Sequence, residues 1–180
     1  MNRILYVLFA LAICGTAMAQ NTVTITDADL LGGQTYNWTS DNVYELDGYV
    51  FLEEGGVLNI APWTVIKGKT VPSNGDQTSA LIITKGAQIF AEGTAQDPII
   101  FTGEIDDLTT TTDLTADDNQ TWGGLIILGN SIVGEDGGTD VIEGIPSDEP
   151  RIIYGGDDPM DNSGTLTYVS IRHGGSVIGA

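Results

Sequence analysis

The chain has 180 residues, long enough for one domain with a hydrophobic core, and carries a formal net charge of −19 from 25 acidic and 6 basic residues. A surface of this charge repels nucleic acid and anionic membranes, so both are poor candidates for partners, whereas divalent cations are attracted. The single cysteine lies within the first 19 residues, so we expect no disulfide in the rest of the chain.

Residues 1–19 are predicted to be a secretory signal. A charged start at Arg3 precedes the apolar run 4–13, and a small-x-small cleavage sequence occupies 17–19. The apolar run is shorter than a membrane span, which needs roughly 20 apolar residues. An alternative is a lipoprotein signal that ends at Cys14. Both interpretations predict an exported protein that is secreted or held at the outer cell surface.

The segment 20–48 is predicted to cap one end of the fold. It starts with an alternating strand at 22–26 and continues through turns rich in Asp and Gly. A solenoid needs an atypical end unit that covers its first apolar layer. We therefore expect an N-terminal cap in this segment.

The clearest pattern is a repeat within residues 56–102. At an offset of 23 residues Leu58 aligns with Leu81, in short β-branched runs whose alternate residues are apolar. Leu125 aligns with Leu81 at an offset of 44, slightly less than two periods. Such a period indicates a solenoid, and in a parallel β-helix it corresponds to one coil of three short strands. We expect Leu58, Leu81 and Leu125 to stack in one inward column.

The remaining residues contain strands separated by polar loops. No segment after the signal has the i, i+3, i+4, i+7 spacing of an amphipathic helix, so we expect an all-β fold. Residues 49–180 are assigned to the rungs of a parallel β-helix, with surface loops at 69–79, 106–120, 134–150 and 155–164.

Several blocks of the sequence together resemble one family. They are GVLNIAPWTVIKG, ALIITKGAQIFAEGTAQDPIIFT, WGGLIILG, VIEGIP and YGGDDPMDNSGTLTYVSIRHGG, spread over residues 56–175. Their order is similar to that in large secreted right-handed parallel β-helix proteins of Gram-negative bacteria, some of which end in a type IX secretion sorting domain. The resemblance implies a right-handed parallel β-helix of pectate-lyase-like architecture. Because members commonly continue for several further rungs, we expect this chain to be an N-terminal fragment.

The acidic turn in the 155–164 loop is the candidate metal site. The β-helix fold also carries polysaccharide lyases, which resemble one another in using Asp-bound calcium with an arginine or lysine base. Asp157, Asp158 and Asp161 are therefore candidate calcium ligands, close in sequence to two arginines. The spacing lacks the D-x-[DN]-x-[DN]-G order of a calcium loop. The alternative is a turn whose side chains bond to their own backbone.

Other residue types give weaker indications of a site. His173, the only histidine, lacks an orienting partner and a nucleophile motif nearby, so we do not expect it to be catalytic. Acidic residues are too numerous for a glycosidase pair to be recognised. Trp38, Trp63 and Trp122 have the chemistry to stack on sugars. Trp63 and Trp122 occur at repeat-related turns, and we expect them to fill corners of the rungs.

These observations favour a non-catalytic extracellular scaffold that adheres to a surface or binds glycans or cations through its acidic face and loops. The alternative is a carbohydrate-active enzyme, a polysaccharide lyase or hydrolase, on the same fold. No cofactor is expected other than the candidate calcium ion. The expected partner is a glycan or another cell-surface component.

Overall fold

The computed structural model describes residues 20–110 and 113–179. The predicted signal and its alternative lipidation site, Cys14, lie outside these residues. Within them the chain forms strands β1 to β14 and one short 3-10 helix, η1. In this part of the chain, no helix has the length and apolar character needed to cross a membrane. The predicted all-β class is confirmed.

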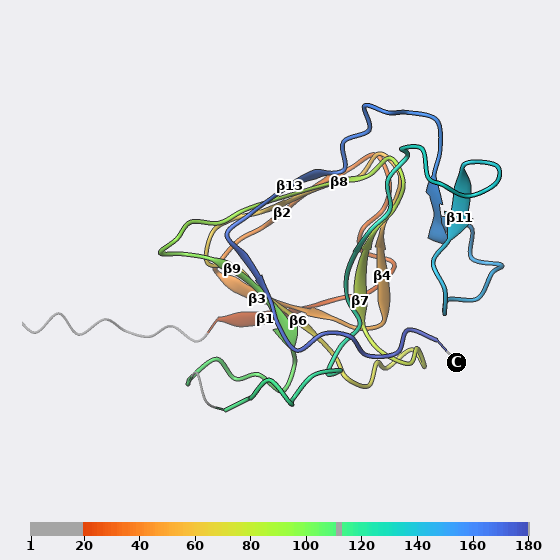
Figure 1. Cartoon of the computed structure of the whole chain (residues 1–180). Helices are drawn as coiled ribbons and strands as arrows, with labels where there is room; N and C mark the ends of the chain where they lie inside the picture. The colour runs from red at the N-terminus through yellow and green to blue at the C-terminus, as the bar shows by residue number, and fades with distance from the viewer. Residues whose placement is uncertain (1–19, 111–112, 180) are drawn as a thin grey trace, which may run out of the picture.

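Three parallel sheets form the sides of a triangular solenoid (Figure 1). Sheet 1 contains β1 (Asn21–Ile25), β3 (Asn42–Leu46), β6 (Val65–Gly68), β9 (Ile99–Gly103) and β14 (Val169–Ile171). Sheet 2 contains β2 (Thr35–Trp38), β5 (Val57–Ile60), β8 (Gln88–Glu92) and β13 (Gly164–Thr167). Sheet 3 contains β4 (Tyr49–Leu52), β7 (Ala80–Ile83) and β10 (Gly124–Ile127). The predicted parallel β-helix is thus confirmed.

The interior is filled by alternate residues of these strands. In β5, Leu58 and Ile60 are buried and point inward, whereas Val57 and Asn59 lie on the outer face. Burial of each aliphatic side chain contributes roughly 1.5–3 kcal/mol, so the core is the main source of stability. Its fully buried members include Leu46, Leu52, Leu58, Ile66, Leu81, Ile83, Ile89, Ile99 and Phe101.

Trp122 enters this core after the 106–120 loop. Its ring stacks on Phe101 with the centroids 6.3 Å apart, and its indole nitrogen donates to the carbonyl of Arg172 at 2.8 Å. Gly68 makes room for it, because an added Cβ there would lie 2.7 Å from the Cβ of Trp122. The bond to Arg172 also satisfies the only polar atom of the buried ring.

A second apolar layer covers the outer face of sheet 3. An antiparallel pair, β11 (Thr139–Val141) with β12 (Ile153–Gly155), lies outside this sheet together with η1 (Pro150–Ile152) (Figure 1). We call residues 134–155 the outer hairpin; β11 falls inside the predicted loop 134–150. The layer explains why β4 and β7 are nearly continuous apolar runs, since both of their faces are covered. It is formed by Phe51, Ala80, Ile82, Leu128, Ile145 and Ile152.

The coils do not stack at the predicted offset of 23 residues. Leu58 of β5 lies opposite Ile89 of β8, whereas Leu81 lies between Val50 and Leu125. The predicted neighbours Leu81 and Leu125 are confirmed, but placing Leu58 in the same column was wrong. The second and fourth residues of β5 and of β7 are all buried and apolar, so aligning these two strands matches residues as well as the true alignment of β5 with β8.

The real offset varies because the loops differ in length. Thr35 lies opposite Val57, 22 residues later, in the first pair of sheet 2. Val57 lies opposite Gln88, 31 residues later, because the loop 69–79 lies between them. The segment 20–48, predicted as a cap, lies at one end of the stack, where β1 and β2 are the edge strands of their sheets. Its strands already have the parallel pairing of the rungs.

Two isoleucines that lie opposite each other test the inward column of sheet 3. Ile83 is completely buried, whereas Ile127 on the next coil is 39% exposed. Ile83→Ala is expected to lower the free energy of unfolding by roughly 2–5 kcal/mol, and Ile127→Ala by less because part of its side chain remains in water. Denaturant unfolding of both variants measures the difference. Equal losses would contradict the inward position of Ile83.

Candidate functional site

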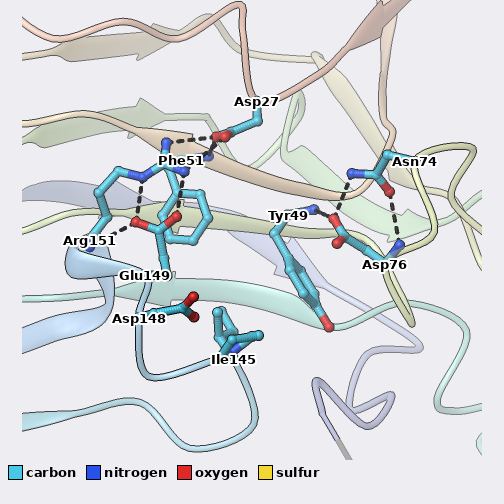
Figure 2. Close-up of a pocket in the computed structure, with 10 residues that line it drawn as sticks. Asp27, Tyr49, Phe51, Asn74, Asp76, Ile145, Asp148, Glu149 and Arg151 are labelled. Carbon is cyan, nitrogen blue, oxygen red and sulfur yellow. Dashed lines mark hydrogen bonds and ion pairs between the residues drawn. The ribbon is translucent and has the colours of Figure 1, made fainter.

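The candidate functional site is a pocket on the outer side of sheet 3, which we call the outer pocket. Its volume is about 350 Å³, and Figure 2 shows its lining residues. The walls come from the turn after β1, from β4, from the 69–79 loop and from the outer hairpin. The lining residues are Asp27, Tyr49, Phe51, Asn74, Asp76, Ile145, Pro146, Asp148, Glu149 and Arg151.

Arg151 of η1 forms one wall of the outer pocket. Two of its nitrogens donate to the two carboxylate oxygens of Asp27 at 3.0 and 2.9 Å. Nε and Nη2 donate to the two carboxylate oxygens of Glu149, each at 2.8 Å. The guanidinium carbon lies 4.1 Å from the centre of the Phe51 ring. Bidentate pairs are the strongest charge-assisted bonds, so Arg151 fastens the outer hairpin to the first coil.

The same bonds determine the proton occupancy of the pair. Hydrogen bonding to Arg151 holds the pKa of Glu149 below its usual range, although burial acts in the opposite direction. Hydrogen bonding to Glu149, followed by Asp27, raises the pKa of Arg151 against the effect of its own burial. Glu149 is therefore a carboxylate and Arg151 a cation at neutral pH. Neither is suited to exchange a proton with a ligand.

The opposite wall is formed around Asp76. Its Oδ2 accepts from the backbone nitrogen of Tyr49 and from the amide nitrogen of Asn74, both at 2.7 Å. The Tyr49 hydroxyl donates to the carbonyl of Ile178. Burial, and then the negative charge of Asp76, raises the pKa of the Tyr49 phenol, which stays protonated. The wall is held in place by bonds from both the backbone and the side chains.

Asp148 supplies the open acceptor of the outer pocket. Figure 2 shows its carboxylate between Glu149 and Ile145, without a dashed contact. Among the described residues, it has no hydrogen-bond or ion-pair partner. A carboxylate accepts hydrogen bonds through two oxygens, so Asp148 offers acceptors for donors on a ligand.

In the described residues, the ion-pair partners of Arg151 are Asp27, Glu53 and Glu149, and the three candidate calcium ligands are not among them. Asp158 accepts from the backbone nitrogen of Met160 at 2.9 Å, and Asp161 accepts from that of Asn130 at 2.8 Å. No group of three or more His, Cys, Asp or Glu side chains in the described residues is arranged to hold a metal ion. Calcium binding by Asp157, Asp158 and Asp161 stays a prediction. The observed bonds of Asp158 are those of the alternative, a turn that bonds to its own backbone.

His173, Trp38 and Trp122 contribute to packing or to loop contacts, whereas Trp63 is exposed. The Nδ1 atom of His173 lies 2.8 Å from the carbonyl of Asp118, and this contact joins the last coil to the 106–120 loop. Trp38 and Trp122 are buried, but Trp63 is 54% exposed. The prediction that Trp63 fills a corner was therefore wrong. Its backbone adopts a left-handed φ of 65° in a tight turn, which leaves the ring at the surface.

The residues of the outer pocket were not recognised in the sequence. Asp27 and Arg151 are 124 positions apart, and no spacing rule joins them. The one local signal is Glu149-Pro150-Arg151, in which Glu149 caps η1 by accepting from the backbone nitrogen of Arg151 at 2.9 Å. This signal identifies a helix start but not a pocket.

Comparison with protein families identifies a match over most of the chain. The family described as "Pectate-lyase like beta helix domain" matches residues 32–180. This range contains strands β2 to β14, the outer hairpin and every residue of the outer pocket except Asp27. Comparisons with curated proteins and with solved structures found no match. The family match agrees with the pectate-lyase-like architecture predicted from the sequence.

The ion pair at Arg151 predicts a response of the outer hairpin to pH. Because the folded pKa of Glu149 is depressed, its stabilising contribution is present above about pH 4.3, the ordinary value for glutamate, and is lost as the pH falls through the folded pKa. Amide hydrogen exchange of residues 145–152 should therefore speed up in acid, after correction for the intrinsic rate. Glu149→Gln should weaken protection at pH 7 and reduce its pH dependence. Corrected protection that stays constant down to pH 3 would contradict this role.

The calcium prediction is tested by thermal unfolding. A calcium site formed by Asp157, Asp158 and Asp161 stabilises the folded chain in proportion to its occupancy, so the melting temperature should rise with calcium concentration. Asp158→Asn should reduce the increase, while Asp117→Asn, in a different loop, should not. A melting temperature independent of calcium would contradict the prediction.

Proposed function

The chain belongs to the family of pectate-lyase-like β-helix domains, and from this membership we propose that it is a non-catalytic extracellular scaffold that binds glycans through the outer pocket. A domain of this family fits a carbohydrate-related extracellular protein. The predicted signal at 1–19 supports secretion or display at the outer cell surface. The resemblance to secreted proteins of Gram-negative bacteria with type IX secretion supports the same location.

The observation that carries the proposal is the unpaired carboxylate of Asp148 within a preformed concave site. Ligand pockets combine apolar walls with a few fixed polar groups, and here Ile145 and Pro146 accompany Tyr49 and the carboxylates. The hydroxyl groups of a sugar donate hydrogen bonds, and the carboxylate of Asp148 accepts them. The neighbouring Arg151 is already occupied by its partners, so it holds the wall in place.

The charge of the outer pocket favours neutral glycans. Asp27, Asp76, Asp148 and Glu149 line it together with a single cation, Arg151. The carboxylate of an acidic sugar would meet more negative than positive groups, and the strongest donors of Arg151 are in use. Neutral hexose units avoid this repulsion.

The lowered pKa of Glu149 supports binding over the alternative, a polysaccharide lyase or hydrolase. A general acid for glycoside cleavage needs a raised pKa, which is the opposite of the shift at Glu149. A lyase base must take up a proton, and the pKa of Arg151 is raised, which keeps it protonated. Glu149 and Arg151 therefore act as a fixed wall of a binding site and not as a catalytic acid and base.

The binding role predicts a specific loss in Asp148→Asn. A hydrogen bond to a charged group is worth roughly 1.5–3 kcal/mol, so we expect affinity for a neutral oligosaccharide such as cellohexaose to fall about tenfold or more. Isothermal titration calorimetry measures the change. The matched control is Asp117→Asn, which removes the same charge from the exposed 106–120 loop and should leave the affinity unchanged.

A cleavage assay separates the scaffold from an enzyme. The chain is incubated with neutral and acidic polysaccharides, and new reducing ends and unsaturated sugars are measured. The scaffold proposal expects neither product. Cleavage that Asp148→Asn or Arg151→Lys abolishes would overturn it in favour of the carbohydrate-active enzyme.

A further inference from the structure

A second polar surface lies on sheet 2, a different side of the solenoid from the outer pocket (Figure 1). Asn37 of β2, Asn59 of β5 and Phe90 of β8 are opposite one another in successive coils. Their neighbours along the strands, such as Trp38 and Ile60, are buried in the core. Because residues alternate between the faces of a strand, the two asparagines and Phe90 face outward in one row.

The row lies in a hollow of the surface, which we call the ladder groove. Its volume is about 360 Å³. The turns that follow β2 and β5 supply Thr39, Ala61 and Pro62 to its lining, and Glu92 of β8 also contributes. The row of outward residues continues to Thr165 of β13, opposite Phe90. The hollow itself is lined by residues of β2, β5 and β8 and therefore crosses three successive coils.

The asparagine pair presents one donor and one acceptor in fixed positions. The Nδ2 atom of Asn59 donates to Oδ1 of Asn37 at 3.0 Å. Among the described residues this is the only bond of either side chain, so the Nδ2 of Asn37 and the Oδ1 of Asn59 stay available. Turning both amides over would reverse the bond and still leave one free amide nitrogen and one free oxygen. Two adjacent hydroxyl groups of a sugar ring match this arrangement, since each can donate or accept.

Phe90 adds an apolar contact beside the amides. Its ring is half-buried and lies in the same row, one strand from Asn59. Strands in a sheet are roughly 4.8 Å apart, so amides and ring together span more than one sugar-sized unit along the solenoid axis. A sugar offers hydroxyls on its rim and an apolar C–H face, which suits an aromatic ring next to amides. Glu92 at the edge of the groove and the net charge of −19 repel acidic sugars.

We propose that the ladder groove binds a neutral polysaccharide strand that runs along the solenoid axis, with adjacent hydroxyls on Asn37 and Asn59 and a sugar face on Phe90. The proposal rests on the proposed glycan-binding function and adds a second, independent site on another sheet. Two sites on different sides would allow one scaffold to join two glycan strands.

The test uses calorimetric titration of the whole chain with cellohexaose and with an oligogalacturonate of equal length. Phe90→Ala should reduce the affinity of one class of site for cellohexaose about tenfold, whereas Phe90→Tyr keeps the ring and should retain the affinity. Asn37→Ala, at an exposed position, should weaken the same site and serves if Phe90→Ala impairs folding. Circular dichroism confirms that each variant is folded.

Combining these variants with Asp148→Asn separates the two proposals. Loss of affinity in Phe90→Ala but not in Asp148→Asn supports the ladder groove and contradicts the outer pocket. Unchanged binding in folded Phe90→Ala and Asn37→Ala overturns the ladder groove, whatever Asp148→Asn does. Binding of oligogalacturonate more tightly than cellohexaose overturns the neutral ligand class. Absence of binding by the unaltered chain overturns both sites.

Discussion

Parallel, in-register pairing between coils is the constraint on which the rest of this structure depends. It places each residue directly above its counterpart, so Leu81 packs between Val50 and Leu125 inside, while Asn59 meets Asn37 outside. A one-residue shift within a strand would turn every inward side chain to the surface. Extra residues are therefore accommodated between strands and not inside them. The loops that form the outer pocket are consequences of this rule.

Four of the five basic residues in the described ranges hold these loops against the coils. Lys67 donates to the carbonyl of Asp106, Lys69 to Asp47, and Lys85 to the carbonyl of Gly155, while Arg151 fastens the outer hairpin. Burial alone would raise the pKa of Asp47, but hydrogen bonds from Ser73 and then Lys69 lower it instead. This carboxylate thus stays ionised and ties the 69–79 loop to β3 through both partners. These cations hold the surface loops in place, while the net charge of the chain remains strongly negative.

Local patterns in the sequence were sufficient to predict the fold class but not to assign each strand to its sheet. Alternation of apolar residues reports on a few neighbours, so the strands, the solenoid and the pairing of Leu81 with Leu125 were predictable. The sheet to which each strand belongs was not predictable, because the inward residues of β5 and β7 have the same spacing although the two strands lie in different sheets. The contact of Asp27 with Arg151 depends on how the coils stack and on how the outer hairpin folds back. Such contacts become visible only when every loop has been placed.

The ligand that this surface binds also depends on long-range contacts and not on composition alone. Net charge is a property of composition, but whether a surface attracts an anion depends on whether its cations are free. In the described residues, Arg151 is enclosed by Asp27 and Glu149, and the three lysines bond to carbonyl or carboxylate oxygens. At the outer pocket, an anionic polymer would have to displace the partners of Arg151 before it gained a bond there, and the displacement would leave a carboxylate or the outer hairpin unheld. Within the described ranges, the exposed side chain of Arg172 donates only to Ser170, but it does not line the outer pocket. A neutral polysaccharide requires no displacement, since the acceptors of Asp148 and Asn59 already face the solvent.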